Sequence, residues 1–167
     1  MGQTVDLKFQ LVINNITDLT VGTVTDLNSV NLDDALTDGV GLNMSDRVWY
    51  SRRTVTAAAE TLDLTALTRT VQGNTVTTNF AKIKGLLIHN RNTTAAKKLT
   101  IGAAATNAWT AWSSVATSTI LIQPDGQLHL WAPDLAAWAV SGTTKNLKID
   151  PGADTIEYTI AILGTSS

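Results

Sequence analysis

The feature that most constrains the fold is a two-residue alternation of apolar and polar side chains that recurs along the chain. It is clearest near the N-terminus, where the apolar members are Val5, Leu7, Phe9, Leu11 and Ile13. A period of two indicates a half-buried β-strand, and the 3.6-residue period of a helix is sustained nowhere. Turn-forming residues separate such segments at roughly 8–12 residue spacing, which is typical of antiparallel sandwiches. We therefore expect an all-β protein, an antiparallel β-sandwich of jelly-roll type.

Candidate strands fill the second half of the chain. They are residues 76–78, 82–90, 97–101, 118–123, 127–131, 138–140, 146–149 and 156–163. The segment "GLLIHN" (85–90) is apolar on both faces, as expected of a strand in the middle of a sandwich. The segment "QPDGQ" predicts a tight hairpin, in which Pro124 fixes φ and Gly126 supplies a positive φ.

Two regions are expected, an N-terminal arm over residues 1–46 and a β-sandwich domain over residues 47–167. After its first strand the arm continues through residues 14–46, which are rich in Asn, Asp and Gly and suggest only two short strands, over residues 20–27 and around Leu32. Irregular segments of this length are usually functional or flexible. Because such a stretch cannot build a core of its own, we expect the arm to lay its strand on the edge of another sheet.

Composition limits the classes of function. Thr accounts for 27 of the 167 residues, whereas charged residues make up only 16%. Its β-branched side chain packs on a pleated surface and remains wettable. The net charge of −2 gives no general affinity for nucleic acid. The absence of Cys excludes disulfides and thiolate metal sites. We also expect no secretory signal and no membrane helix, since no apolar run reaches about 18 residues.

No group of residues points to catalysis. His89 and His129 supply at most two nitrogen ligands, fewer than a catalytic zinc needs, and a His at the end of a buried strand is usually structural. No Ser lies in a Gly-x-Ser-x-Gly context. The segment "NLDDALTDG" offers oxygen atoms to calcium but lacks the EF-hand spacing. We expect no enzyme activity, no cofactor and no metal.

The aromatic residues leave two interpretations open. Trp supplies most of them, at positions 49, 109, 112, 131 and 138. Exposed Trp on sandwich loops, such as those in "NAWTAW", can form a platform on which sugars stack. Alternatively, the indoles fill the ends of a core that has few Phe residues, or lie in a subunit interface, where Trp is enriched.

The densest candidate interaction surface is "RVWYSRR". It brings together five residues of the types found in interface hot spots, which are Arg47, Trp49, Tyr50, Arg52 and Arg53. Alternation places Tyr50 on one face of this strand and Trp49 and Arg53 on the other. We expect this patch to be a partner interface, with Trp49 as its buried anchor, and a solvated strand face is the alternative.

Five segments between Trp49 and the C-terminus carry a resemblance. They read "AAAETLDL", "AKIKGLLIHNRNTT", "LTIGAAATNAWTAW", "ILIQPDGQLHLWAPD" and "LKIDPGADTIEYTIAILG". Together they resemble a group of short β-sandwich structural proteins of tailed bacteriophages, which are virion-associated. The resemblance implies a virion component of the head or of the tail. It describes a scaffold rather than a ligand, and it does not extend to the residues before Asp46.

Two functions follow as hypotheses. The first is a capsid decoration (cement) protein, a homotrimer made in the host cytoplasm that binds the major capsid protein on the capsid exterior and stabilises the shell. In this hypothesis the arm and "RVWYSRR" reach onto capsid subunits, where Arg52 and Arg53 meet carboxylates. The alternative is a receptor- or carbohydrate-binding module of a tail or head fibre that uses the Trp-rich loops.

Overall fold

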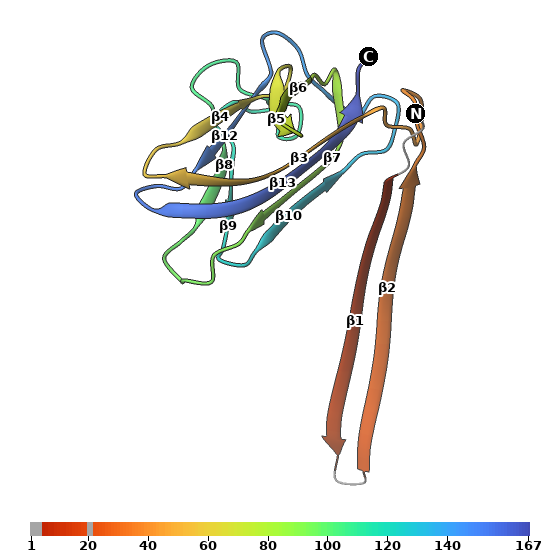
Figure 1. Ribbon diagram of the computed structural model, residues 1–167. Coiled ribbons are helices and arrows are strands. Elements are labelled where there is room, and N and C mark those ends of the chain that lie inside the picture. The colour runs from red at the N-terminus through yellow and green to blue at the C-terminus, as the bar shows by residue number, and fades with distance from the viewer. Residues whose placement is uncertain (1–4, 20–21) are drawn as a thin grey trace.

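The computed structural model describes the backbone of residues 5–19 and 22–167 and the side chains from residue 35 onward. This part of the chain contains thirteen β-strands and no helix. The strands form two larger sheets and two hairpins, and every strand pairing is antiparallel (Figure 1). The expectation of an all-β fold is therefore confirmed.

The two larger sheets contain nine strands. The five-stranded sheet has the order β10 (Gln127–Trp131), β7 (Lys82–Asn90), β13 (Thr155–Thr165) and β3 (Arg47–Thr56), with β11 (Trp138–Ala139) also paired to β7. The four-stranded sheet has the order β4 (Glu60–Asp63), β12 (Asn146–Asp150), β8 (Leu99–Gly102) and β9 (Thr119–Ile122). The hairpins are β1 (Val5–Leu19) with β2 (Gly22–Leu36), and β5 (Leu67–Val71) with β6 (Asn74–Thr78).

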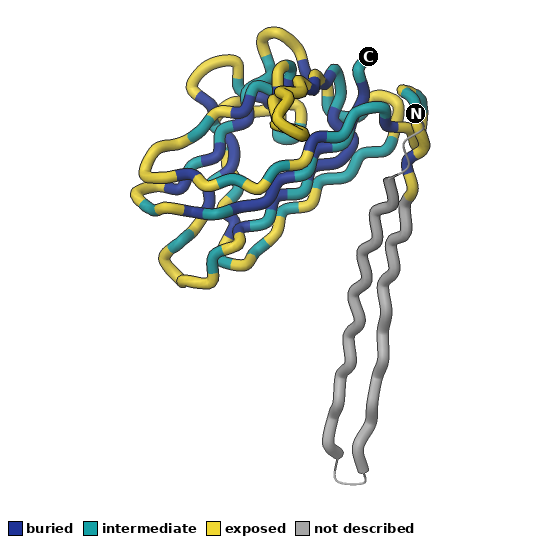
Figure 2. Tube along the Cα trace, in the orientation of Figure 1, coloured by how far each residue is buried: buried dark blue, intermediate teal, exposed yellow. Residues whose placement is uncertain are grey.

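The core lies between the two larger sheets, whose inward-facing residues alternate with outward-facing ones (Figure 2). Strand β13 contributes Ile156, Tyr158, Ile160 and Ile162, all without solvent exposure. The four-stranded sheet contributes Leu147 and Ile149 from β12 and Leu99 and Ile101 from β8. Burial of each such side chain contributes about 1.5–3 kcal/mol, so this layer supplies most of the driving force for folding. The arrangement is that of a β-sandwich.

Most strands of the sandwich lie where alternation predicts them. Strands β7 and β10 have the predicted bounds, and β7 is an interior strand as expected of "GLLIHN". Its side chains Leu86 and Ile88 enter the core, whereas Leu87 and His89 face outward and are half-buried. Strand β5 was not predicted, because its Thr-rich alternation gives little apolar contrast.

The prediction for "QPDGQ" is partly wrong. The turn is tight, since the Gly126 amide donates to the Gln123 carbonyl at 2.9 Å. However, it connects β9 to β10, which belong to different sheets, so it is a corner of the sandwich and not a hairpin. The positive φ of 58° falls on Asp125 rather than on Gly126. Gly126 instead allows the two backbone segments of the turn to approach each other, because a Cβ at this position would lie 2.8 Å from the Gln123 carbonyl oxygen.

The prediction of only two short strands in residues 14–46 is also wrong. Strands β1 and β2 are each 15 residues long and pair along their whole length, from Val5 opposite Leu36 to Leu19 opposite Gly22. Pairing satisfies the backbone of β2, so a segment with weak strand propensity of its own is held by its partner. Among the described strands, β1 and β2 pair only with each other.

A linking segment, residues 36–46, joins the hairpin to β3 and is tied to the sandwich near the end of β10. The Asn43 amide donates to the Pro133 carbonyl at 2.9 Å. The fully buried Lys84 on β7 donates its ammonium group to the carbonyls of Gly41 and of Pro133, the latter at 3.3 Å. Burial lowers the pKa of Lys84, and the nearby Asp134 carboxylate opposes that shift. Lys84 therefore fixes the place from which the hairpin leaves the sandwich.

We predict that Lys84→Met loosens the linking segment without unfolding the sandwich. The substitution keeps the apolar stem but removes a charged donor from two backbone carbonyls, a loss of about 1.5–3 kcal/mol in local stability. Hydrogen exchange at the Asn43 amide should accelerate by about tenfold or more, while core amides on β13 exchange as before. Lys82→Met, a half-buried neighbour on the same strand, is the matched control. Unchanged exchange at Asn43 would show that Lys84 does not hold the segment.

Candidate interaction surface

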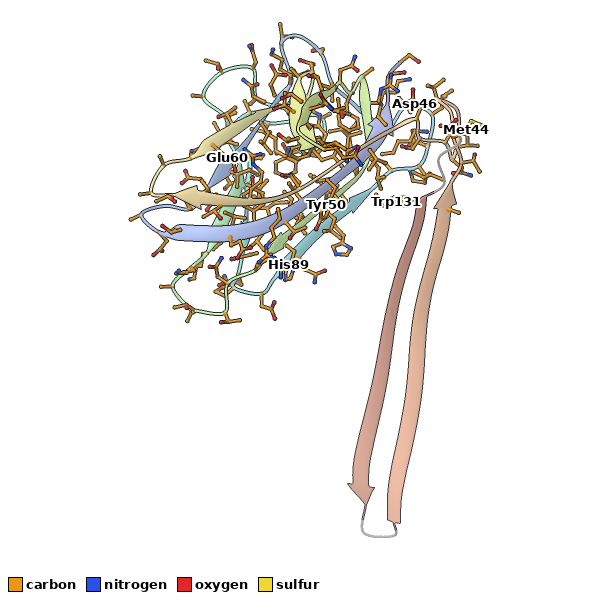
Figure 3. All side chains as sticks on the ribbon, viewed as in Figure 1. Met44, Asp46, Tyr50, Glu60, His89 and Trp131 are labelled. Carbon is orange, nitrogen blue, oxygen red and sulfur yellow. The ribbon has the colours of Figure 1, made fainter. Side chains whose placement is uncertain are left out.

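The residues of the predicted patch lie on strand β3, and their side chains alternate between its two faces as the sequence indicates. Tyr50 is 53% exposed and faces outward, on the same face of the sheet as His89 (Figure 3). Trp49 faces inward and is only 1% exposed, and its Nε1–H donates to the Thr68 carbonyl at 3.2 Å. The expectation that Trp49 anchors a partner is therefore wrong, because the indole already fills the core of its own sandwich. A Trp49→Ala variant would test folding and not partner binding.

Arg52 shares the outward face and is paired within the chain. Its guanidinium bonds to the Glu157 carboxylate on the neighbouring strand β13. Arg91 also lies 4.0 Å from this carboxylate. The hydrogen bond from Arg52 lowers the pKa of Glu157. Both side chains of the Arg52–Glu157 pair are well exposed, at 56% and 37%, so solvent screens the pair and it contributes little to stability.

Arg53 belongs to a more buried cluster that joins the two sheets. Its Nη2 and Nε atoms lie 2.7 Å and 3.0 Å from Oε2 of Glu60 on β4. The other carboxylate oxygen of Glu60 accepts the hydroxyl of Tyr158, which is fully buried on β13. Burial, together with this hydrogen bond, raises the pKa of Tyr158. The Tyr158 hydroxyl thus stays protonated as a donor, and the cluster closes the sandwich where β3 and β4 meet.

Arg47 is likewise paired, with Asp46 at 3.3 Å. Asp46 in turn accepts the Ser166 amide at 2.9 Å and the Ser166 hydroxyl at 2.6 Å, which holds the end of β13 against the start of β3. Each of the three predicted arginines therefore has a carboxylate within its own chain. A partner carboxylate would have to compete with these existing pairs.

Beside the patch lies a groove that sequence reasoning missed. It has a volume of about 560 Å³ and runs between β3 and the β5–β6 hairpin. Its lining includes Tyr50, Arg52 and Arg53 from β3 and Arg69 from β5. Arg69 makes no ion pair with any residue that the structure describes. The sequence signal that could have placed Arg69 is the turn at Gln72–Gly73. Both residues have positive φ values, 50° and 80°, and the turn closes the β5–β6 hairpin that brings Arg69 near β3.

The Trp-rich loops offer no exposed indole. Trp109 is buried, and Trp112 packs against the core and donates its Nε1–H to the Trp109 carbonyl at 2.9 Å. Trp138 also packs against the core. Trp131 lies over Gly85 on the outer face of the five-stranded sheet, where a Cβ would meet its ring at 3.0 Å. Trp109, Trp112 and Trp138 thus match the interpretation that the indoles fill gaps in a core with few Phe residues, whereas Trp131 lies outside that core.

The remaining candidate chemistry is sparse in the described residues. His89 Nε2 lies 3.1 Å from Asp125 Oδ1, and His129 Nε2 lies 2.9 Å from Gln127 Oε1. Residues 35–167 contain no cluster of three His or carboxylate side chains arranged to hold a metal. Of the segment "NLDDALTDG", residues 31–34 lie outside the described side chains. In the part of the chain that can be assessed, no helix is long and apolar enough to cross a membrane.

Comparison with known proteins adds no relative. No protein family model, no curated protein and no solved structure matches the chain. The interaction surface is therefore interpreted from its own geometry.

We predict that the two arginine pairs differ in their contribution to stability. Arg53→Ala leaves the half-buried Glu60 carboxylate without its cation and should lower the free energy of unfolding by about 1–3 kcal/mol. Arg52→Ala removes an exposed pair and should change it by less than about 0.5 kcal/mol. Urea unfolding of both variants and of the parent chain measures the difference. Equal losses would contradict the assignment of Arg53 as the bond between the sheets.

Proposed function

We propose that the chain is a structural protein of a tailed-phage virion, a capsid decoration protein that binds the outer surface of the major capsid shell and stabilises it. The sequence resemblance motivates this proposal. The observation that carries it is the combination of a β-sandwich with a long N-terminal hairpin that pairs with neither of its sheets. A rigid body with an arm suits a protein that bridges neighbouring subunits.

The strand order supports a sandwich of jelly-roll type. Setting aside the two hairpins and the short β11, eight strands remain, with the orders β3-β13-β7-β10 and β4-β12-β8-β9. The first strand of these eight thus pairs with the last, and the second with the seventh. Such nesting is what two interlocked Greek keys produce, and jelly rolls of this kind occur in viral capsid and lectin domains.

The hairpin supports the role of residues 1–46 as an arm. Fifteen residues of extended strand measure roughly 50 Å, more than the width of a small domain. An arm of that length can contact a subunit that the sandwich itself does not touch. As a homotrimer at the three-fold positions of an icosahedral shell, the chain would multiply weak contacts through effective concentration.

The alternative, a carbohydrate-binding fibre module, has less support. Its argument depends on exposed indoles in the loops, and Trp109 and Trp112 are instead engaged with the core. No observation on the described residues favours it over decoration.

The copy number of the chain in purified virions tests the proposal. We expect a quantitative gel to give a copy number of the same order as that of the major capsid protein. Imaging of intact particles should show added density outside the shell, since a cement protein occupies repeated sites on the lattice. A few copies per particle, or density confined to the tail, would contradict decoration. Such a result, with binding on a glycan array, would support the fibre module.

A further inference from the structure

We propose that the free edge of β3 is the docking site for the β1–β2 hairpin of a second copy of this chain, which extends the five-stranded sheet. The proposal concerns how copies of the chain assemble, and it does not depend on whether the assembly decorates a capsid. Four observations carry it: the length of the edge, the groove beside it, the distribution of charge, and the anchoring of the hairpin.

The edge of β3 is unusually long for an open edge. Strand β3 has 10 residues and, among the described strands, pairs only with β13, whereas the other strands that end the two larger sheets have five residues in β10 and four each in β4 and β9. A long open edge presents a row of unpaired N–H and C=O groups and tends to recruit another strand. The short edges need no cover. The edge of β3 does.

The β1–β2 hairpin, like the edge of β3, lacks a neighbouring strand among those described. Strands β1 and β2 pair with no other strand in the described part of the chain, so each has one edge without a neighbour there. An isolated two-stranded hairpin is marginally stable in water, and a third strand is the usual remedy. Its strands of 15 residues are long enough to pair with the whole of β3. Backbone pairing of this kind gives affinity without demanding a particular side chain at every position.

Charge favours this occupant over an arbitrary strand. Residues 1–46 contain seven Asp and one Lys, whereas residues 47–167 contain eleven Lys and Arg and seven Asp and Glu. The chain therefore divides into an acidic segment with a net charge of −6 and a basic segment with a net charge of +4, and the hairpin itself, residues 5–36, has five Asp and one Lys, a net charge of −4. The guanidinium groups of Arg52, Arg53 and Arg69 line the groove beside the edge. The first two are paired with carboxylates of their own sandwich, so the positive charge without an ion pair among the described residues is that of Arg69. An acidic strand is thus complementary to this groove.

The hairpin of the same copy is held away from this groove. The linking segment is bonded through Asn43 and Gly41 to Pro133 and Lys84, beside the end of β10. In the sheet order, β10 is at the opposite edge from β3, and three inter-strand spacings separate them, roughly 14 Å. Met44 lies in this linking segment, at the right of the sandwich in Figure 3. A second copy is therefore the source of the docked hairpin.

Photo-cross-linking of the full chain tests the proposal. A benzophenone amino acid replaces Tyr50, which lines the groove and is 53% exposed. In a matched control it replaces Leu121, which is 50% exposed on β9, an edge strand of the other sheet. Chains labelled with 14N and 15N are refolded together, so that mass spectrometry separates cross-links between copies from those within one. We expect position 50 to link to residues 5–36 of the opposite isotope, and position 121 to do so rarely.

The other outcomes overturn the proposal. Links from position 50 to residues 5–36 of the same isotope alone would mean that each copy covers its own edge. Links to any other segment, or equal linking from position 121, would place the interface elsewhere. A chain that remains monomeric and gives no link between copies would show that the edge stays open.

A charge reversal provides an independent test in the same full chain. Arg69→Glu places a negative charge in the groove and should weaken self-association roughly tenfold at low salt, measured by sedimentation. Lys98→Glu makes the same change on an exposed loop that does not line the groove, and it should leave association nearly unchanged. The difference should shrink in 1 M salt, where screening is strong. If the two variants associate equally, the groove does not receive the acidic strand.

Discussion

Burial of β13 between two sheet neighbours and against the facing sheet is the constraint on which the rest of the structure depends. Its inward side chains Ile156, Tyr158, Ile160 and Ile162 have no solvent exposure, and its backbone pairs with β3 on one side and β7 on the other. A strand buried in this way cannot change register by one residue without moving every one of these side chains out of the core. The faces of β3 and β7 are fixed by that register, and so is the position of the candidate surface. Tyr50 and Arg52 face outward because Trp49 and Val55 must face inward.

Periodicity predicted the strands, but it could not predict how they combine. The bounds of β7 and β10 follow from alternation, because that signal depends only on neighbouring residues. The prediction that Tyr50 and Trp49 lie on opposite faces of β3 is also confirmed. Which of them faces the core was not decided by β3 alone, since both faces of that strand carry aromatic and arginine residues. The decision comes from β13 and from Thr68, which are far away in sequence.

Other parts of the candidate surface depend on contacts that have no local signal. Arg69 reaches the groove because the Gln72–Gly73 turn folds β5 and β6 together, and the Thr-rich alternation of these strands is weak. The partners Glu60 and Glu157 come from a different sheet and a neighbouring strand, so the pairing of the arginines could not be read from "RVWYSRR". The charge division between residues 1–46 and the sandwich, in contrast, was present in the sequence and is hidden only by the small net charge.

The charge of the groove also disfavours the pairing of two copies through their own β3 edges. If the β3 edges of two copies paired with each other, the Arg69 guanidinium groups beside the two edges would be brought together, and like charges disfavour that contact because neither has an ion pair among the described residues. Charge on an edge strand is a common protection against indiscriminate pairing. An acidic strand reverses the sign of the interaction. The groove therefore repels the groove of a second copy but attracts the hairpin of that copy. Specificity then arises from charge, and affinity from the backbone. This division of roles suits a Thr-rich surface that offers few large apolar contacts.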